Sequence, residues 1–380
     1  MMKKLLWLCL LIPFCELQAQ IATATFDPTV MNFNPAIADT RFFGGYYTSL
    51  NYRKINASGT ETGDIPDQQL TNLNSNWDVE DEVKSFNFLY SNIKNKFNLF
   101  PEVFITRQNL ISSYTRTDNK GVDPVSGLEE ESDITTTHVN LAYEVIPNLN
   151  LGVHVAYSKI DQNVDADLRI EGNPVSEVRT ADIDMTGYGI GLNYKLPYNL
   201  YFGAFYRYYG LDQTGSQTAN YGSGEETRDE SGEFEFKSHG YALAYQVGSK
   251  DDRALKIEIS ESRNTNEVSL LDKGLRRRLI IEAMNKKFFG GLSINQLKGN
   301  FINFQSIVDS LLSERVNSDK TTMNYGIAAG FRTTSGHSFG ASASYSKETI
   351  QSQISFINDS KFESEVKNLT LSLSYAYIVF

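Results

Sequence analysis

The chain of 380 residues contains only two cysteines, four histidines and two tryptophans. Both cysteines, Cys9 and Cys15, precede residue 20, so the rest of the chain can form no disulfide. So few histidines argue against a His-rich metal site. Basic residues number 35 against 46 acidic ones, which disfavours a nucleic-acid partner. The aromatic residues, by contrast, are numerous, with 21 tyrosines and 23 phenylalanines.

Residues 1–19 have the pattern of a secretory signal peptide. Lys3 and Lys4 precede an apolar core over residues 5–14, and Ala19 stands before the expected cleavage site at Gln20. The bulky Phe14 before Cys15 argues against a lipoprotein anchor. The apolar core is too short to span a bilayer as a helix, which takes about 20 residues, and no later segment is long enough. We therefore expect an exported protein, either soluble or an outer-membrane barrel.

Alternation of apolar and polar residues decides between these two. Residues 137–145 alternate Thr, Val, Leu, Tyr and Val with polar or small residues, and residues 149–157 repeat the pattern after Pro147-Asn148, which predicts a hairpin. Similar alternation recurs along the chain, with aliphatic residues in mid-strand, Tyr or Phe towards the strand ends, and Gly, Ala, Ser or Asn on the other face. This pattern is typical of a lipid-facing barrel wall.

The sequence thus predicts an all-β fold, a transmembrane antiparallel β-barrel of about fourteen strands over residues 41–380. An even number of strands places both termini in the periplasm. Short turns are expected near Pro147 and Pro197, and residues 275–287 have a helical alternative. Long acidic outer loops are expected over 56–81, 117–132, 165–177 and 212–231.

Residues 20–40 precede the first strand and are too irregular for a strand but too apolar to be free in water. We expect them to lie in the lumen as a plug, or to pack at the periplasmic mouth without gating. The motif Phe33-Asn34-Pro35-Ala36 lies in this segment. Together with an acidic barrel, it resembles the FadL/TodX family of outer-membrane transporters of hydrophobic compounds.

That resemblance implies a plug formed by Phe33, Asn34, Pro35 and Ala36, ligand entry from outside, and lateral exit through a kinked strand. Residues 34–39, Asn-Pro-Ala-Ile-Ala-Asp, also resemble a segment of the PorP/SprF barrels, which implies a role in a secretion or gliding complex. Ile37 and Asp39 depart from the Tyr and Gly of that family.

Pro101 lies within the expected third strand, where it cannot donate a hydrogen bond to a neighbouring strand. One interpretation is a lateral opening towards the bilayer, like the kinked strand of the FadL-like barrels. The other is a strand that begins only at Glu102, with Pro101 in the preceding turn.

Residues 301–316 break the alternation, with apolar residues at helical spacing in an expected outer loop. Their apolar face is a candidate first site for a hydrophobic ligand, or it packs on neighbouring loops for stability. The candidate ligand-binding residues are Phe301, Phe304, Ile307, Val308 and Leu311.

The last expected strand alternates through Tyr375 and Tyr377 and ends at Phe380. A terminal Phe resembles the signal read by the outer-membrane assembly machinery, which is therefore an expected partner. Phe380 is even-numbered, whereas the apolar set of this strand is odd-numbered.

The main basic cluster comprises Arg276, Arg277, Arg278, Lys286 and Lys287. It would bind lipopolysaccharide phosphates or an anionic headgroup, or balance acidic loops. In a strand, however, Arg277 would face away from the other two arginines. Acidic pairs such as Asp251-Asp252 lack EF-hand spacing, so no metal and no cofactor are expected.

A catalytic role is not expected. His138 and His154 face inward on adjacent strands, but the hairpin register places them roughly 7–13 Å apart, and no Ser partner motif accompanies either. The sequence therefore predicts passive uptake of small hydrophobic molecules, such as long-chain fatty acids, across the outer membrane of a Gram-negative bacterium. The alternatives are a structural component of a secretion or gliding complex, and a general porin.

Overall fold

The chain folds as one closed β-barrel of fourteen antiparallel strands, in which each strand pairs with its neighbours in sequence. The computed structural model describes residues 45–65, 70–91, 99–118, 125–170, 173–220, 224–248, 253–266, 273–285, 287–301, 316–335, 337–354 and 360–379. The strands are β1 Gly45–Ile65, β2 Leu70–Ser91, β3 Leu99–Asp118, β4 Val125–Ile146, β5 Leu149–Ile170, β6 Asn173–Leu196, β7 Leu200–Asn220, β8 Glu225–Gly248, β9 Arg253–Asn266, β10 Lys273–Asn285, β11 Phe288–Phe301, β12 Val316–Arg332, β13 His337–Ile354 and β14 Ser360–Val379.

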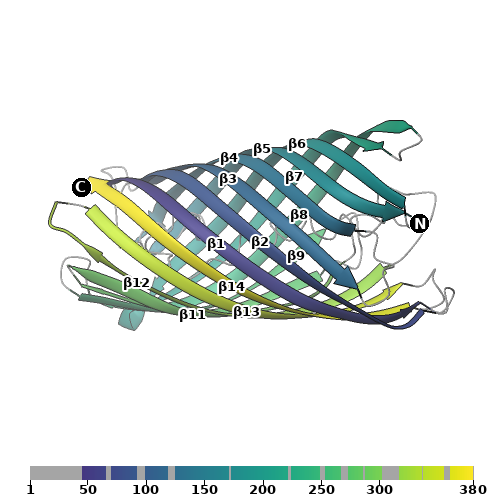
Figure 1. The fold of residues 1–380 in the computed structure, drawn as a ribbon. Helices are drawn as coiled ribbons and strands as arrows, with labels where there is room; N and C mark the ends of the chain where they lie inside the picture. The colour runs from purple at the N-terminus through teal and green to yellow at the C-terminus, as the bar shows by residue number, and fades with distance from the viewer. Residues whose placement is uncertain are drawn as a thin grey trace.

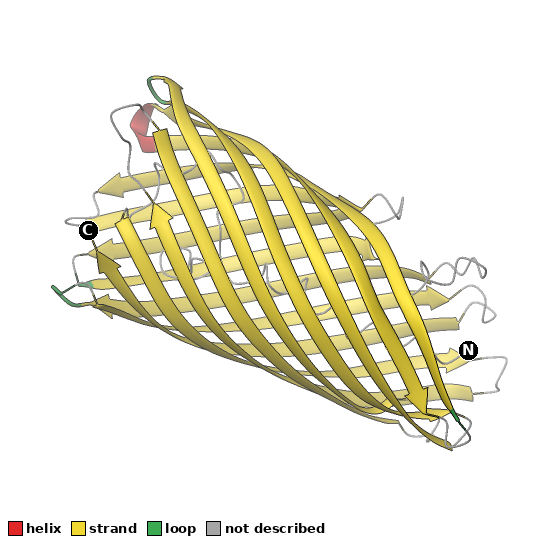
Figure 2. Ribbon diagram, turned by 90° about the horizontal axis from the view of Figure 1, so that it is seen from above, coloured by secondary structure: helices red, strands yellow, loops and turns green. Residues whose placement is uncertain are grey.

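The last strand closes the wall against the first. Pairing between β1 and β14 runs from Tyr46 opposite Val379 to Gly63 opposite Phe362, and the strongly tilted strands form a continuous wall (Figures 1 and 2). Closure matters because the hydrocarbon core offers no water to backbone N–H and C=O groups, so an open sheet edge there would be costly. The expectation of a fourteen-stranded antiparallel barrel is confirmed.

Short turns join the strands at one end of the barrel. Pro147-Asn148 joins β4 to β5 with Asn148 at φ 73°, a left-handed conformation that Asn tolerates. A 3-10 turn, Pro197–Asn199, joins β6 to β7, as expected for a tight turn at Pro197. In outer-membrane barrels the short turns face the periplasm, and we orient the molecule accordingly.

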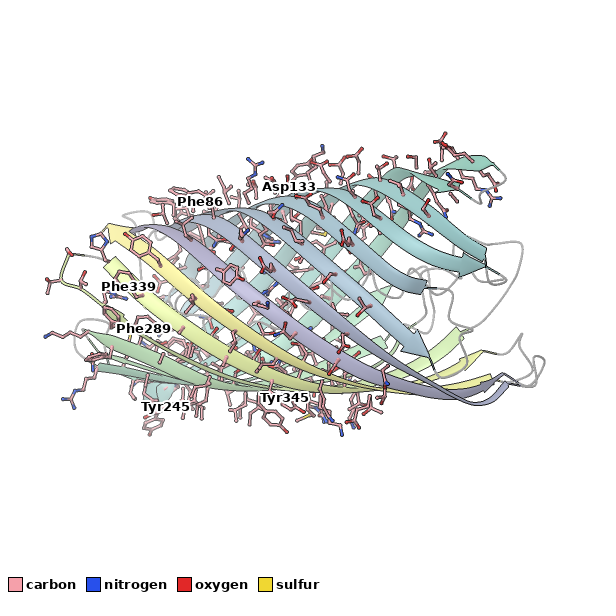
Figure 3. All side chains as sticks on the ribbon, viewed as in Figure 1. Phe86, Asp133, Tyr245, Phe289, Phe339 and Tyr345 are labelled. Carbon is pink, nitrogen blue, oxygen red and sulfur yellow. The ribbon has the colours of Figure 1, made fainter. Side chains whose placement is uncertain are left out.

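The outer surface of the periplasmic half is apolar. On β5, Val153 and Val155 point outward with 51% and 59% of their surface exposed, an arrangement suited to lipid. Aromatic residues flank this band, with Tyr188 stacked on Tyr208 at 4.9 Å on the outer side. Figure 3 shows Phe86, Tyr245, Phe339 and Tyr345 along the wall. In the described part of the chain, no helix is long and apolar enough to cross a membrane.

The expectation of long outer loops over 56–81, 117–132, 165–177 and 212–231 is wrong for most of these residues, because the strands continue through them. β5, for example, has 22 residues and β6 has 24, whereas about 9–11 residues cross a bilayer. The extracellular extensions carry polar residues on their outward face, since that face meets water. Apolar alternation therefore ends at the membrane boundary although strand pairing does not.

Candidate functional site

The inward face of β3 to β7 carries one row of polar residues across the membrane-embedded wall, which we call the luminal row. Strand register places Glu102, Asn140, His154, Gly189 and Arg207 side by side on five successive strands. The amide of Asn140 donates to Glu102 Oε1 at 2.9 Å, and its Oδ1 lies 2.7 Å from His154 Nδ1, which therefore carries the proton of that bond. The row joins an anionic end to a cationic end through two neutral groups.

Two glycines on β6 allow this row to assemble. A Cβ at Gly189 would lie 2.7 Å from Arg207 Cγ, and one at Gly187 would lie 2.4 Å from the ring of Tyr209. The bare backbone of β6 thus lets two long β7 side chains lie across it towards β5. Arg207 Nη1 donates to Tyr209 Oη at 3.1 Å, and the Tyr209 ring meets His154 edge-on at 6.4 Å.

The two histidines of the hairpin lie closer together than the hairpin register alone predicts. The rings of His138 and His154 stack with centroids 5.3 Å apart, because diagonal neighbours on adjacent strands can lean towards each other. Phe104 packs on the other side of His138 at 5.8 Å. Ser158, the nearest serine on β5, donates to Thr136 and not to an imidazole. The closer approach thus joins the histidines to an aromatic wall and does not form a nucleophile pair.

An apolar luminal cluster lies on the extracellular side of the luminal row. Ile134, Ile160 and Ile183 pack together on β4, β5 and β6, with Ala181 and Leu211 against them. On β4, Ile134 is four residues further from the Pro147 turn than His138. A molecule that descends along this wall would meet apolar side chains first and the luminal row next.

A buried ion cluster lines another sector of the wall. Glu258 on β9 lies 3.0 Å from Lys256 and 2.8 Å from Arg278 of β10, and all three side chains are almost fully buried. Burial of charge is tolerated only with such pairing. Among the described residues, no group of three or more His, Cys, Asp or Glu is arranged to hold a metal ion.

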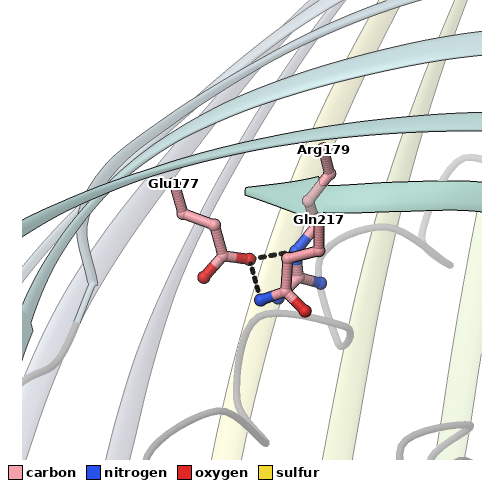
Figure 4. A network of polar contacts seen from close by, with 3 residues as sticks. All are labelled: Glu177, Arg179 and Gln217. Carbon is pink, nitrogen blue, oxygen red and sulfur yellow. Dashed lines mark hydrogen bonds and ion pairs between the residues drawn. The ribbon is translucent and has the colours of Figure 1, made fainter. Parts of the chain in front are cut away.

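A third polar network lies in the extracellular extension. Glu177 accepts hydrogen bonds from Arg179 Nε and from Gln217 Nε2, the latter at 2.7 Å, and all three point into the barrel (Figure 4). Nearby, Glu130 accepts bonds from Gln162 at 2.7 Å and Ser132 at 2.9 Å. Hydrogen bonds between polar side chains on neighbouring strands therefore brace the outer part of the lumen.

Pro101 lies inside β3, whose first residue is Leu99, and it pairs in register with Leu141 of β4. The pairing of β3 with β2 begins one residue later, where Glu102 faces Ser91. The strand therefore begins before Pro101. Its first three residues, 99–101, pair with β4 and precede the described pairing with β2. Phe100 and Phe104, buried on the inward face, flank the position.

Most of the other predicted site residues lie outside the described residues. These are the plug residues Phe33, Asn34, Pro35 and Ala36, the loop residues Phe304, Ile307, Val308 and Leu311, and the terminal Phe380. Phe301 is the last residue of β11. Tyr375 packs against Phe339 at 5.2 Å and its hydroxyl lies 2.8 Å from His337 Nδ1, while Tyr377 pairs in register with His337.

The basic cluster at 276–278 is split between two faces, as the alternation requires. Residues 273–285 form β10, so the helical alternative for this segment is wrong. Arg278 is buried in the lumen against Glu258, whereas Arg277 is exposed outside and pairs with Glu261 at 3.0 Å. These arginines cannot form one patch.

The lumen also contains charged side chains that were not among the predicted site residues, such as Glu102, Arg207, Lys256 and Glu258. A signal for the last two is present, because they alternate with Leu255, Ile257 and Ile259. A charged residue that alternates with lipid-facing apolar residues must point into the barrel.

Comparison with known proteins identifies relatives by fold and not by sequence. No family model matches the chain, and no curated protein sequence matches it. A FadL homologue of Pseudomonas aeruginosa superposes with a TM-score of 0.60 at 11% identity, covering 94% of this chain and 96% of that one. The toluene transporter TodX of P. putida gives 0.56 at 10% identity over 92% and 94%, and TbuX of Ralstonia pickettii gives 0.50 at 11% over 96% of each. The chain thus has the fold of the FadL and TodX barrels, as its N-terminal motif and strand pattern indicated.

Proposed function

We propose that this barrel mediates passive uptake of small hydrophobic molecules across the outer membrane of a Gram-negative bacterium. The observation that carries this proposal is the apolar luminal cluster of Ile134, Ile160 and Ile183, with Ala181 and Leu211, on the inner wall. The three isoleucines form the buried base of the cluster, and Ala181 and Leu211 are its partly exposed members. An apolar solute that covers them is stabilised by about 25 cal/mol per Å² removed from water, whereas a polar solute is not.

The luminal row below this cluster favours ligands that also carry a polar group. His154 is almost fully buried, and its Nε2 has no hydrogen-bond partner among the described residues, which leaves an acceptor in the lumen. Such an acceptor suits a ligand with a hydroxyl group. Arg207, at the cationic end of the same row, suits a carboxylate, and we therefore propose long-chain fatty acids as one cargo. The outer loop around Phe304 is the proposed first contact, Asn34–Ala36 the proposed plug, and Pro101 the proposed lateral exit.

Uptake into liposomes tests this proposal. Purified barrel in liposomes should admit a hydrophobic probe faster than a sugar of similar size, and deletion of residues 21–39 should change that flux. Sugar flux without probe uptake would contradict the proposal. Co-purification with a large secretion complex, without probe uptake, would favour an assembly role.

Leu211→Asn should lower probe uptake about tenfold, because it replaces a partly exposed apolar contact worth about 1.4 kcal/mol on the inner wall. Val178→Asn is the matched control, since Val178 lies on the outward face of the extracellular extension with 48% of its surface exposed. The control should take up probe as the parent barrel does. Equal losses in both variants would show that the cluster is not part of the route.

A further inference from the structure

The outer wall carries a regular row of cations at its upper lipid boundary. Five adjacent strands, β13, β14, β1, β2 and β3, each place one Lys or Arg outward, two residues beyond an outward apolar side chain. Because β14 pairs with β1, the row crosses the barrel closure, where Lys54 lies four residues along β1 from Ser58, the register partner of Lys367. We call it the basic arc; it consists of Lys347 beyond Tyr345, Lys367 beyond Leu369, Lys54 beyond Tyr52, Lys84 beyond Phe86 and Arg107 beyond Ile105.

The position of the arc is set by the apolar residues beneath it. Phe86, Tyr52 and Ile105 are outward-facing and exposed, which suits contact with lipid chains and with the interfacial zone. A residue two positions further lies about 6.6 Å along the strand, which is about 5 Å higher at a tilt of about 35–45°. The cationic groups therefore lie at the height of lipid headgroups.

Three of the five cations already have carboxylate partners. Glu80 pairs with Lys54, and Glu365 lies between Lys347 at 2.8 Å and Lys367 at 3.2 Å. Lys84 and Arg107 are exposed and have no ion pair among the described residues. Glu82, the nearest acidic residue along β2, faces Lys54 in register.

Lys84 and Arg107 lie close enough to share one anion. Arg107 faces Phe86 in register, so Lys84 is its diagonal neighbour on β2, at a spacing of about 7–8 Å. The guanidinium group offers a planar pair of donors that fits a phosphate, and the ammonium group adds a second charge.

The neighbouring sector of the wall has the opposite character. Asp133, Asp161 and Asp182 face one another in register on β4, β5 and β6, also on the outward side. Figure 3 shows Asp133 on the outside of the wall, at the top edge of the view. An anionic lipid is therefore repelled from that sector and attracted to the basic arc.

We propose that the basic arc binds the phosphate of an outer-leaflet glycolipid, with Lys84 and Arg107 as the primary phosphate contacts. The aromatic and aliphatic side chains below them contact the acyl chains of the same lipid. This lipid site lies on the outer wall and is separate from the proposed luminal route.

Binding of diphosphoryl lipid A to the full-length barrel in detergent micelles tests the proposal. The double variant Lys84→Gln, Arg107→Gln should bind about 10- to 30-fold more weakly, because each cation near a charged lipid surface contributes about fivefold. Lys159→Gln is the matched control: Lys159 also follows an outward aromatic, Tyr157, but it pairs with Asp161 in the acidic sector. This control should bind as the parent barrel does.

Circular dichroism and the heat-dependent gel mobility of each variant establish that it is folded. Binding of the double variant within twofold of the parent would overturn the proposal, as would equally tight binding of dephosphorylated lipid A. Tighter binding of inorganic phosphate than of lipid A would also overturn it, since it would assign the site to a free anion.

Discussion

Glu258→Gln should destabilise the barrel by about 3–5 kcal/mol, because it removes the carboxylate that pairs with both Lys256 and Arg278. The amide retains the shape of the carboxylate but presents a donor to two cations. Glu282, buried on β10, balances one positive charge at most. Denaturant unfolding from lipid vesicles measures the loss.

Glu261→Gln is the matched control for this change. Glu261 lies three residues further along β9 on the outward face and pairs with the exposed Arg277. Exposed ion pairs contribute about 0.2–1 kcal/mol, so the control should lose no more than that.

Adding Lys256→Met to Glu258→Gln should restore part of the stability, because it removes the surplus buried charge. Equal losses at positions 258 and 261 would mean that luminal water screens the cluster as well as bulk water does.

The fold was predictable because the bilayer imposes a strict alternation. Val153 and Val155 must face lipid, so His154 between them must face the lumen, and this parity extends along every strand that crosses the membrane. Beyond the membrane boundary both faces of a strand meet polar surroundings, so apolar and polar residues no longer alternate along it. The parts of β5 and β6 that project beyond the membrane on the extracellular side were therefore mistaken for loops, although their strand pairing continues.

The candidate site was predictable only in part. The alternation along a strand shows whether a side chain points into the lumen or towards lipid, but it does not show which side chains it contacts. His138 and His154 were correctly placed in the lumen, yet their stacking depends on how two side chains lean across a strand pair. The luminal row requires the register of five strands, from Glu102 to Arg207, and no local pattern encodes that register. The approach of Arg207 to His154 further depends on the missing side chain of Gly189.

Gly189→Val should cost about 3 kcal/mol of stability and displace Arg207 from the luminal row. The first added carbon would lie 2.7 Å from Arg207 Cγ and 2.8 Å from the backbone oxygen of Tyr206, and the backbone cannot yield without disturbing the pairing of β6 with β7. A larger branched side chain adds to this overlap. Unfolding from vesicles measures the stability, and probe uptake measures the effect on the lumen.

Gly210→Val is the control, because it makes the same chemical change in the neighbouring strand β7. The atoms nearest to a Cβ there are 3.7 Å or more away, which is an ordinary contact, and Val favours a strand. The control should therefore stay within about 0.5 kcal/mol of the parent. If both variants lost the same stability, the cost would come from branching in a strand and not from the close packing of Arg207 over β6. If Gly189→Val alone is destabilising, the bare backbone at this position is what lets the luminal row form.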